Sequence, residues 1–217
     1  MKSRLSLLCL LIFPLLTQAE PRLAVGEFSQ GSLEGWNERR FAGHTEYRLV
    51  ELDGNTVLHA QSQASASGLY REMGIDLQHT PFLNWSWRTE QLFEGNDEQT
   101  RAGDDYPVRV YVVFSGGVRF WRTRAINYVW SSHQPLGSEW PNAFTGNARM
   151  IAVNAGSEGL GEWQHLQRNV LEDYRRLFGE TPRRADAVAI MTDSDNTGQS
   201  AEAWYGDIWF SSQPAND

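Results

Sequence analysis

The sequence predicts an all-β fold, a β-sandwich of jelly-roll type with one short helix. Many short runs rich in β-branched and aromatic residues are separated by Gly, Asn, Asp or Pro, and a single run has helical periodicity. Frequent short strands with frequent turns are typical of sandwiches and jelly rolls. The predicted strands are residues 46–52, 56–61, 82–88, 107–114, 126–130, 149–153, 163–170, 187–192 and 205–210.

Two local patterns fix particular elements. Asp53-Gly54-Asn55 lies between the first two predicted strands and has the composition of a tight hairpin turn. The one predicted helix covers residues 171–178, where Leu171 and Tyr174 share an apolar face and Gly179 ends the helix. We expect this helix to cover one end of the sandwich. Residues 91–105 form a polar, acidic insertion without a strand or helix pattern.

Alternation within the strands predicts which side chains face the core. Strand side chains point alternately to opposite faces of a sheet. Residues 83, 85 and 87 place one leucine and two tryptophans on one face, and residues 108, 110 and 112 are all valine. The opposite face of the second strand carries Arg109 and Tyr111, and Asn127 alternates with apolar neighbours in the same way. We expect these three residues to line one polar surface able to bind a polyhydroxylated ligand.

The first 19 residues have the organisation of a signal peptide. Lys2 and Arg4 precede an apolar run, and Thr17-Gln-Ala19 supplies small residues where a signal peptidase cleaves. The run is too short for a transmembrane helix of about 20 residues, so the sequence predicts no integral membrane span. We therefore expect a periplasmic or secreted protein in which residues 20–217 form a single domain. The only cysteine, Cys9, lies in the predicted signal, so no disulfide is expected.

The charge balance narrows the choice of partners. The chain carries 27 Asp and Glu against 19 Lys and Arg, a net charge of −8. An acidic surface disfavours nucleic acid and anionic lipid as partners. The sequence also lacks a nucleophile elbow, a phosphate-binding glycine loop and a zinc-binding histidine pair.

A second candidate site lies in the loop after the predicted strand 187–192. Asp193, Asp195 and Thr197 alternate like the first ligands of a calcium loop, and Gly198 turns the chain. The twelfth position of that loop is Trp204 rather than an acid, which excludes an EF-hand. Calcium held by Asp193, Asp195 and Thr197, with help from elsewhere in the chain, is the candidate cofactor, and a metal-free turn is the alternative.

Carboxylates raise the possibility of catalysis as well as of binding. Asp104 and Asp105 end the insertion, and Asp193 and Asp195 lie in the late loop. A retaining glycosidase needs two carboxyl groups about 5 Å apart and an inverting one needs roughly 6.5–9.5 Å. Turn-forming aspartates explain the same residues without catalysis. If the two loops meet, a cation or an arginine such as Arg101 or Arg109 must compensate their charge.

Several motifs in order resemble the exported bacterial domain-of-unknown-function family 3047. The resemblance spans nearly the whole chain after the predicted signal, and it implies an exported single domain without an established activity. The matching segments are Ser67-Gly-Leu-Tyr-Arg71, Trp85-Ser-Trp-Arg88, residues 102–114, Ile126-Asn-Tyr-Val-Trp130, Arg168-Asn-Val170, Asp173-Tyr-Arg-Arg176, residues 191–198 and Tyr205-Gly-Asp-Ile208.

A looser likeness connects the chain with jelly-roll carbohydrate-binding modules. It rests on Phe28 and Gly35-Trp36 near the start and on the closing strand Gly206-Asp-Ile208. Near loops, Trp121, Trp140 and Trp204 are the aromatic candidates for ligand contact, because sugar rings stack on flat side chains.

These observations predict an exported envelope protein that binds a glycan or another polar envelope ligand without catalysis. The alternatives are a glycan-cleaving enzyme that uses the paired carboxylates, and a structural protein-interaction module. The predicted ligand-binding residues are Asp104, Asp105, Arg109, Tyr111, Asn127, Asp193, Asp195 and Asn196.

Overall fold

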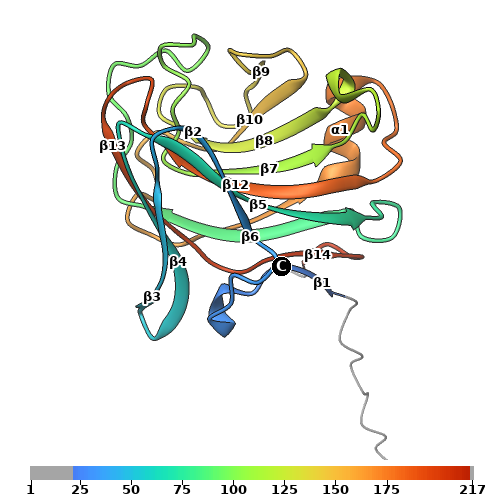
Figure 1. The fold of residues 1–217 in the computed structure, drawn as a ribbon, viewed down its shortest axis with the longest axis horizontal. Helices are drawn as coiled ribbons and strands as arrows, with labels where there is room; N and C mark the ends of the chain where they lie inside the picture. The colour runs from blue at the N-terminus through green and yellow to red at the C-terminus, as the bar shows by residue number, and fades with distance from the viewer. Residues whose placement is uncertain (1–21, 216–217) are drawn as a thin grey trace, which may run out of the picture.

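The computed structural model describes residues 22–215, which form two curved β-sheets with one short α-helix at one end (Figure 1). The predicted all-β sandwich is confirmed. The predicted signal peptide, residues 1–19, lies outside the described residues. Among the described residues, no helix has the length and apolar character needed to cross a membrane.

The first sheet is entirely antiparallel. Its strands are β1 (Arg22–Gly26), β3 (Glu46–Leu52), β4 (Asn55–Gln63), β6 (Phe82–Thr89), β11 (Gln164–Asn169), β13 (Ser200–Tyr205) and β14 (Ile208–Ser211). They follow the order β1-β14-β6-β13-β4-β3, and β11 pairs with β6. Strands β13 and β14 pair with successive parts of β6.

The second sheet carries the candidate site. Its strands are β2 (Asn37–Ala42), β5 (Ala66–Ile75), β7 (Arg109–Phe114), β8 (Arg124–Ser131), β9 (Glu139–Pro141), β10 (Ala148–Ala155) and β12 (Ala185–Asp193). They follow the order β2-β5-β12-β7-β8-β10-β9, and only the β8–β10 pair is parallel. Strands β7 and β12, which are distant in sequence, are therefore neighbours, and the loops at their ends come together.

The core between the sheets consists of the side chains that alternation assigned to it. The predicted core residues of β6, Trp85 and Trp87 among them, are fully buried, as are Val110 and Val112 of β7. The Trp85 ring lies 5.3 Å from the ring of Tyr128 on β8, so it joins the two sheets. Burial of large aromatic side chains on both sheets supplies the main stabilising free energy of such a fold.

The predicted hairpin and helix both form. Asp53 and Gly54 have φ of 53° and 79°, and two successive positive φ values give the type I′ turn that suits a tight hairpin. Helix α1 (Val170–Phe178) begins after Asn169, whose side chain accepts a hydrogen bond from the Glu172 backbone N–H. Gly179 ends it with φ of 70° in the left-handed region.

The strand predicted over 205–210 is wrong, because the chain breaks between β13 and β14. Asp207 turns away to accept hydrogen bonds from the backbone N–H and the hydroxyl of Ser29, at 2.8 and 2.6 Å. Gly206 lies against Ser86, where a Cβ would come within 2.2 Å of the serine Oγ. The strand prediction also missed β1, β2, β5, β9 and β13. Strand β2 is mostly polar and β5 contains two glycines, so neither has a clear strand pattern.

Candidate functional site

The end of the 91–105 insertion and the loop after β12 meet where the central strands β7 and β12 of the second sheet begin and end, respectively. Asp105 is fully buried, and its two carboxylate oxygens accept hydrogen bonds from the backbone N–H groups of Asn196 and Thr197, at 3.2 and 2.6 Å. The register of β12 on β7, which pairs Met191 with Arg109, brings these loops together. Asp105 therefore fixes the shape of the late loop.

A buried ion pair lies beneath the two loops. The Arg109 guanidinium contacts the Asp193 carboxylate, and both side chains are almost completely buried. Asp193 also accepts a hydrogen bond from the Tyr106 backbone N–H at 3.3 Å. Alternation placed Arg109 on the correct face of β7, but Arg109 is buried in an ion pair instead of lying exposed on a polar surface. Arg109 is the arginine that compensates charge where the acidic loops meet.

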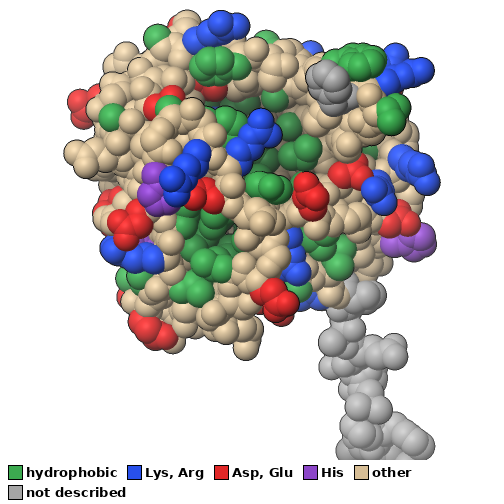
Figure 2. Space-filling model, viewed as in Figure 1, with side chains coloured by type: hydrophobic (Ala, Val, Ile, Leu, Met, Phe, Trp, Pro, Cys, Tyr) green, Lys and Arg blue, Asp and Glu red, His purple; other side chains and the backbone are tan. Residues whose placement is uncertain are grey.

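The outer face of the second sheet is hollowed into two adjoining cavities, which we call the groove. The larger cavity, of about 530 Å³, lies under the converging loops, and the smaller, of about 350 Å³, lies over β5 and β12. Both cavities are lined by Phe41, Tyr111 and Met191, so they lie side by side. Figure 2 shows hydrophobic side chains gathered in hollows that arginine, aspartate and glutamate side chains surround.

The strand register explains the shape of the groove. One row of cross-strand neighbours crosses four strands of the second sheet. It consists of Tyr70 on β5, Ala189 on β12, Tyr111 on β7 and Asn127 on β8. Ala189 has a small side chain, so it leaves room above the sheet between Tyr70 and Tyr111. Gly68 in the next row has the same effect, and a Cβ there would lie 3.0 Å from the Ile190 carbonyl oxygen.

Two exposed aromatic rings line the larger cavity. Phe41, on β2, is 61% exposed, and Phe144, in the loop between β9 and β10, is 51% exposed. Contact of such large apolar side chains with water is unfavourable, and covering them with a flat ligand lowers the free energy. The guanidinium group of Arg39 lies 5.2 Å from the centre of the Phe41 ring, and that of Arg101 lies 5.4 Å from the centre of the Phe144 ring.

The same cavity contains polar groups that no protein atom satisfies. Asn127 is 1% exposed, and neither its amide nitrogen nor its amide oxygen has a hydrogen-bond partner. Asp104 is 4% exposed, and its Oδ1 has no partner, while its Oδ2 accepts from Asn142 at 2.8 Å. Burial raises the pKa of Asp104, and the nearby Arg109 opposes part of that rise. Buried polar atoms without partners cost stability, so their presence at a cavity indicates a binding site.

Seven of the eight predicted ligand-binding residues line the larger cavity. They are Asp104, Arg109, Tyr111, Asn127, Asp193, Asp195 and Asn196. Asp105 lies behind them as the support of the late loop. Tyr111 is only partly buried, and its hydroxyl donates to the Met191 sulfur at 3.3 Å, a weak acceptor.

The group of carboxylates that could hold a metal ion differs from the predicted set, because it contains Asp105 in place of Thr197. Asp105, Asp193 and Asp195 each offer one oxygen within 4.8 Å of the others, a spacing compatible with calcium–oxygen distances of about 2.3–2.6 Å. Thr197 instead accepts a hydrogen bond from the Gln199 backbone N–H at 3.3 Å. Burial, with the charge of Asp105 next, raises the pKa of Asp195. The calcium hypothesis therefore stays a prediction with Asp105 added to Asp193 and Asp195.

Calcium binding is expected to appear as a shift in thermal stability. A site with a dissociation constant of about 0.1 mM gains about 1.4 kcal/mol at about 1 mM calcium, which raises the melting temperature by a few degrees. Asp195→Asn should abolish the shift, whereas Asp53→Asn, at the exposed β3–β4 turn, should retain it. Superimposable melting curves with calcium and with chelator would remove the metal and leave Arg109 as the compensating cation.

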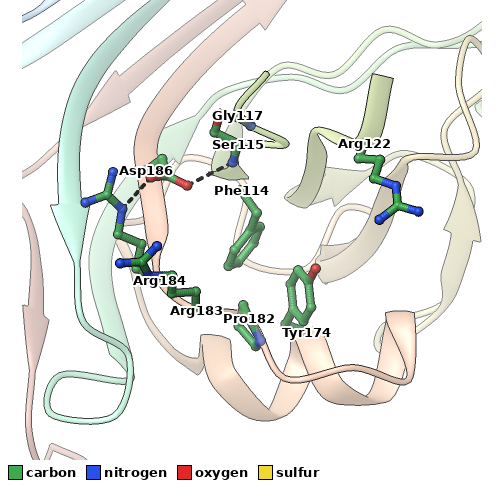
Figure 3. Close-up of a pocket in the computed structure, with 9 residues that line it drawn as sticks. All are labelled: Phe114, Ser115, Gly117, Arg122, Tyr174, Pro182, Arg183, Arg184 and Asp186. Carbon is green, nitrogen blue, oxygen red and sulfur yellow. Dashed lines mark hydrogen bonds and ion pairs between the residues drawn. The ribbon is translucent and has the colours of Figure 1, made fainter. Parts of the chain in front are cut away.

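Another cavity, of about 400 Å³, lies beside helix α1 and contains none of the predicted site residues (Figure 3). In that view the rings of Phe114 and Tyr174 lie between Arg122 on one side and Arg183 on the other. Asp186 accepts hydrogen bonds from the Ser115 backbone N–H at 2.9 Å and from Arg184 at 2.6 Å. The polar groups of Asp186 are thus satisfied within the protein, unlike those of the groove.

The aromatic residues expected at the ligand are not the ones in the groove. Trp140 is buried, and Trp204 stacks on His59 of the first sheet with ring centres 5.1 Å apart. Trp121 is exposed but lies outside both groove cavities. Sequence reasoning missed Phe41 and Phe144. A single phenylalanine inside an otherwise polar segment was the available signal in both cases.

Comparisons with known proteins identify a family for this chain and solved structures that share its fold. A family model described as "Protein of unknown function (DUF3047)" matches residues 34–209. A comparison with curated proteins gives no significant match.

Two solved structures share the fold at low sequence identity. The family 11 carbohydrate-binding module from Clostridium thermocellum, in complex with a β-1,3-1,4-mixed-linked tetrasaccharide, is 10% identical with a TM-score of 0.50 over 92% of this chain and 100% of that chain. The family 30 carbohydrate-binding module of a Clostridium thermocellum cellulosomal cellulase is 11% identical with a TM-score of 0.50, over 90% of this chain and 99% of that chain. At such identity the likeness establishes a shared β-sandwich architecture.

Proposed function

The chain belongs to the family of proteins of unknown function DUF3047. Because this family description names no activity, we infer the function from the groove. The function that the groove supports best is non-catalytic binding of a glycan. The observation that carries this inference is the larger cavity, where exposed aromatic rings and unpartnered buried polar atoms occur together. Sugars present both an apolar ring face and hydroxyl groups, so they satisfy both features at once. The proposed setting is the cell envelope or the exterior, which follows from the predicted signal peptide.

The solved structures support this inference in one respect. Two of them are carbohydrate-binding modules that share the sandwich architecture with this chain. Fold alone does not determine function, so glycan binding is inferred from the side chains of the groove. The residues that line the groove come from β5, β12, β7 and β8, so a bound glycan would lie across the strands of the second sheet.

The arrangement of carboxylates favours binding over cleavage. Both oxygens of Asp105 accept backbone hydrogen bonds, and Asp193 is held by Arg109. A glycosidase needs one carboxyl group to donate a proton and a second to act as nucleophile or base. Of the four aspartates in the two loops, Asp104 and Asp195 remain for these roles, so a glycan-cleaving enzyme at these loops would depend on that pair. A protein-interaction module, the third possibility, would not need the unpartnered buried amide of Asn127.

Removal of either exposed ring is expected to weaken glycan binding. Phe41→Ala and Phe144→Ala should each lower affinity by about tenfold, or 1.4 kcal/mol, because aromatic residues covered by a ligand are typical binding hot spots. Stability should change by no more than about 0.5 kcal/mol, since both rings are largely exposed. Calorimetric titration with oligosaccharides of glucose, N-acetylglucosamine and glucosamine of equal length measures the effect.

Trp121→Ala is the matched control, because it removes an equally exposed ring outside the groove. It should leave the affinity unchanged. Weaker binding by the Trp121 variant, together with normal binding by both phenylalanine variants, would place the ligand elsewhere and refute the proposed site.

A further inference from the structure

The chemistry of the larger cavity narrows the class of glycan. Asp104 and Asn127 come from the insertion and from β8, yet they line the same cavity and are both more than nine-tenths buried. Asp104 Oδ1 and Asn127 Oδ1 are hydrogen-bond acceptors without a protein donor, and Asn127 Nδ2 is a donor without an acceptor. Arg109 Nε in the same lining is a second donor without an acceptor. The ligand must therefore donate hydrogen bonds to the two oxygens and accept them from the two donors, and the hydroxyl oxygens of a sugar can accept such bonds.

The charge of the cavity is negative. Asp104, Asp193 and Asp195 line it, and Arg109 is the only arginine among the described residues of its lining. That arginine is committed to Asp193, which leaves Asp104 without a cation in contact. A buried carboxylate in this situation is costly unless a positive charge pairs with it.

From these observations we propose that the larger cavity binds the protonated amino group of an amino sugar, with Asp104 Oδ1 and Asn127 Oδ1 as its acceptors. An ammonium group supplies three donors and the missing positive charge. Hydroxyl groups of a neutral sugar supply donors without charge, and acidic sugars or phosphates are repelled. This inference rests on the proposed glycan-binding function and specifies the sugar that occupies the cavity.

The test compares three oligosaccharides of equal length, made of glucosamine, N-acetylglucosamine or glucose, on the wild-type protein. The glucosamine oligomer should bind about tenfold or more tightly than the other two, which is the usual size of a charge-assisted hydrogen bond. Asp104→Asn preserves the shape and the contact with Asn142 but removes the charge. It should abolish this preference, so that the three oligomers bind the variant with similar affinity.

Asp53→Asn is the matched control for general attraction between a cationic oligomer and an acidic protein. It removes one carboxylate at the exposed β3–β4 turn and should retain the preference. Equal affinity of the wild-type protein for all three oligomers, or an unchanged preference in Asp104→Asn, overturns the inference while leaving glycan binding in place. Absence of binding by all three overturns the inference together with the proposed function.

Discussion

Replacement of Arg109 by alanine should lower the free energy of unfolding by about 3–5 kcal/mol. Asp193 would remain buried with a negative charge and only the Tyr106 backbone N–H as a donor. The loss follows from this uncompensated charge more than from the missing contact, because a buried ion pair itself adds little net stability. Chemical denaturation of the variant and the wild-type protein measures the difference.

The control for Arg109 is an arginine in an exposed ion pair. Arg40 pairs with Glu38 at 3.1 Å on the surface, and Arg40→Ala should change stability by about 0–1 kcal/mol. Combining Arg109→Ala with Asp193→Ala should cost less than the sum of the single losses, because the double variant leaves no unpaired charge. Additive losses, or a loss below about 1 kcal/mol for Arg109→Ala, would show that the pair is solvated.

Replacement of Asn127 by leucine should separate stability from binding. In the folded protein the buried amide has no partner, so an apolar side chain of similar size should raise stability by about 1 kcal/mol or more. The adjoining cavity has room for the leucine side chain. Ligand affinity should fall by about tenfold or more, because the groups that the ligand satisfies are lost.

Asn84→Leu is the same substitution at a buried asparagine that is fully hydrogen-bonded. Asn84 accepts from Gln167 at 2.6 Å and donates to Phe82 and Ser211, both at 3.0 Å. This variant should lose about 1–3 kcal/mol of stability and keep its ligand affinity. If Asn127→Leu were as destabilising as Asn84→Leu, the Asn127 amide would have a structural role and the binding argument would fail.

Local sequence patterns predicted those parts of the fold that depend on local physics. The β3–β4 turn follows from Asp53 and Gly54, which tolerate positive φ, and the core face of β6 follows from alternation. Strand β5 could not be predicted, because its hydrogen bonds to β2 and β12 stabilise it despite its glycines. The break at Gly206 likewise depends on Ser29 and Ser86, which are distant in sequence.

The candidate site was predicted as a set of residues but not as an arrangement. Alternation correctly placed Arg109, Tyr111 and Asn127 on one face of the sheet, yet it contains no information about what covers that face. The burial of Arg109 results from the convergence of two loops, which follows from the pairing of β7 with β12. Phe41 was missed for a related reason, since the polar strand β2 is recognisable only through its pairing with β5.

The most direct test of glycan binding in the groove is an amide NMR titration of the wild-type protein with the three oligosaccharides. We predict saturable shifts for residues of β5, β12 and β7, including Tyr70, Ala189 and Tyr111, and for the loop that carries Phe144. Residues of the first sheet around His59 and Trp204 should not shift. Shifts confined to that first sheet, or the absence of saturable shifts with any of the three oligosaccharides, would contradict the account.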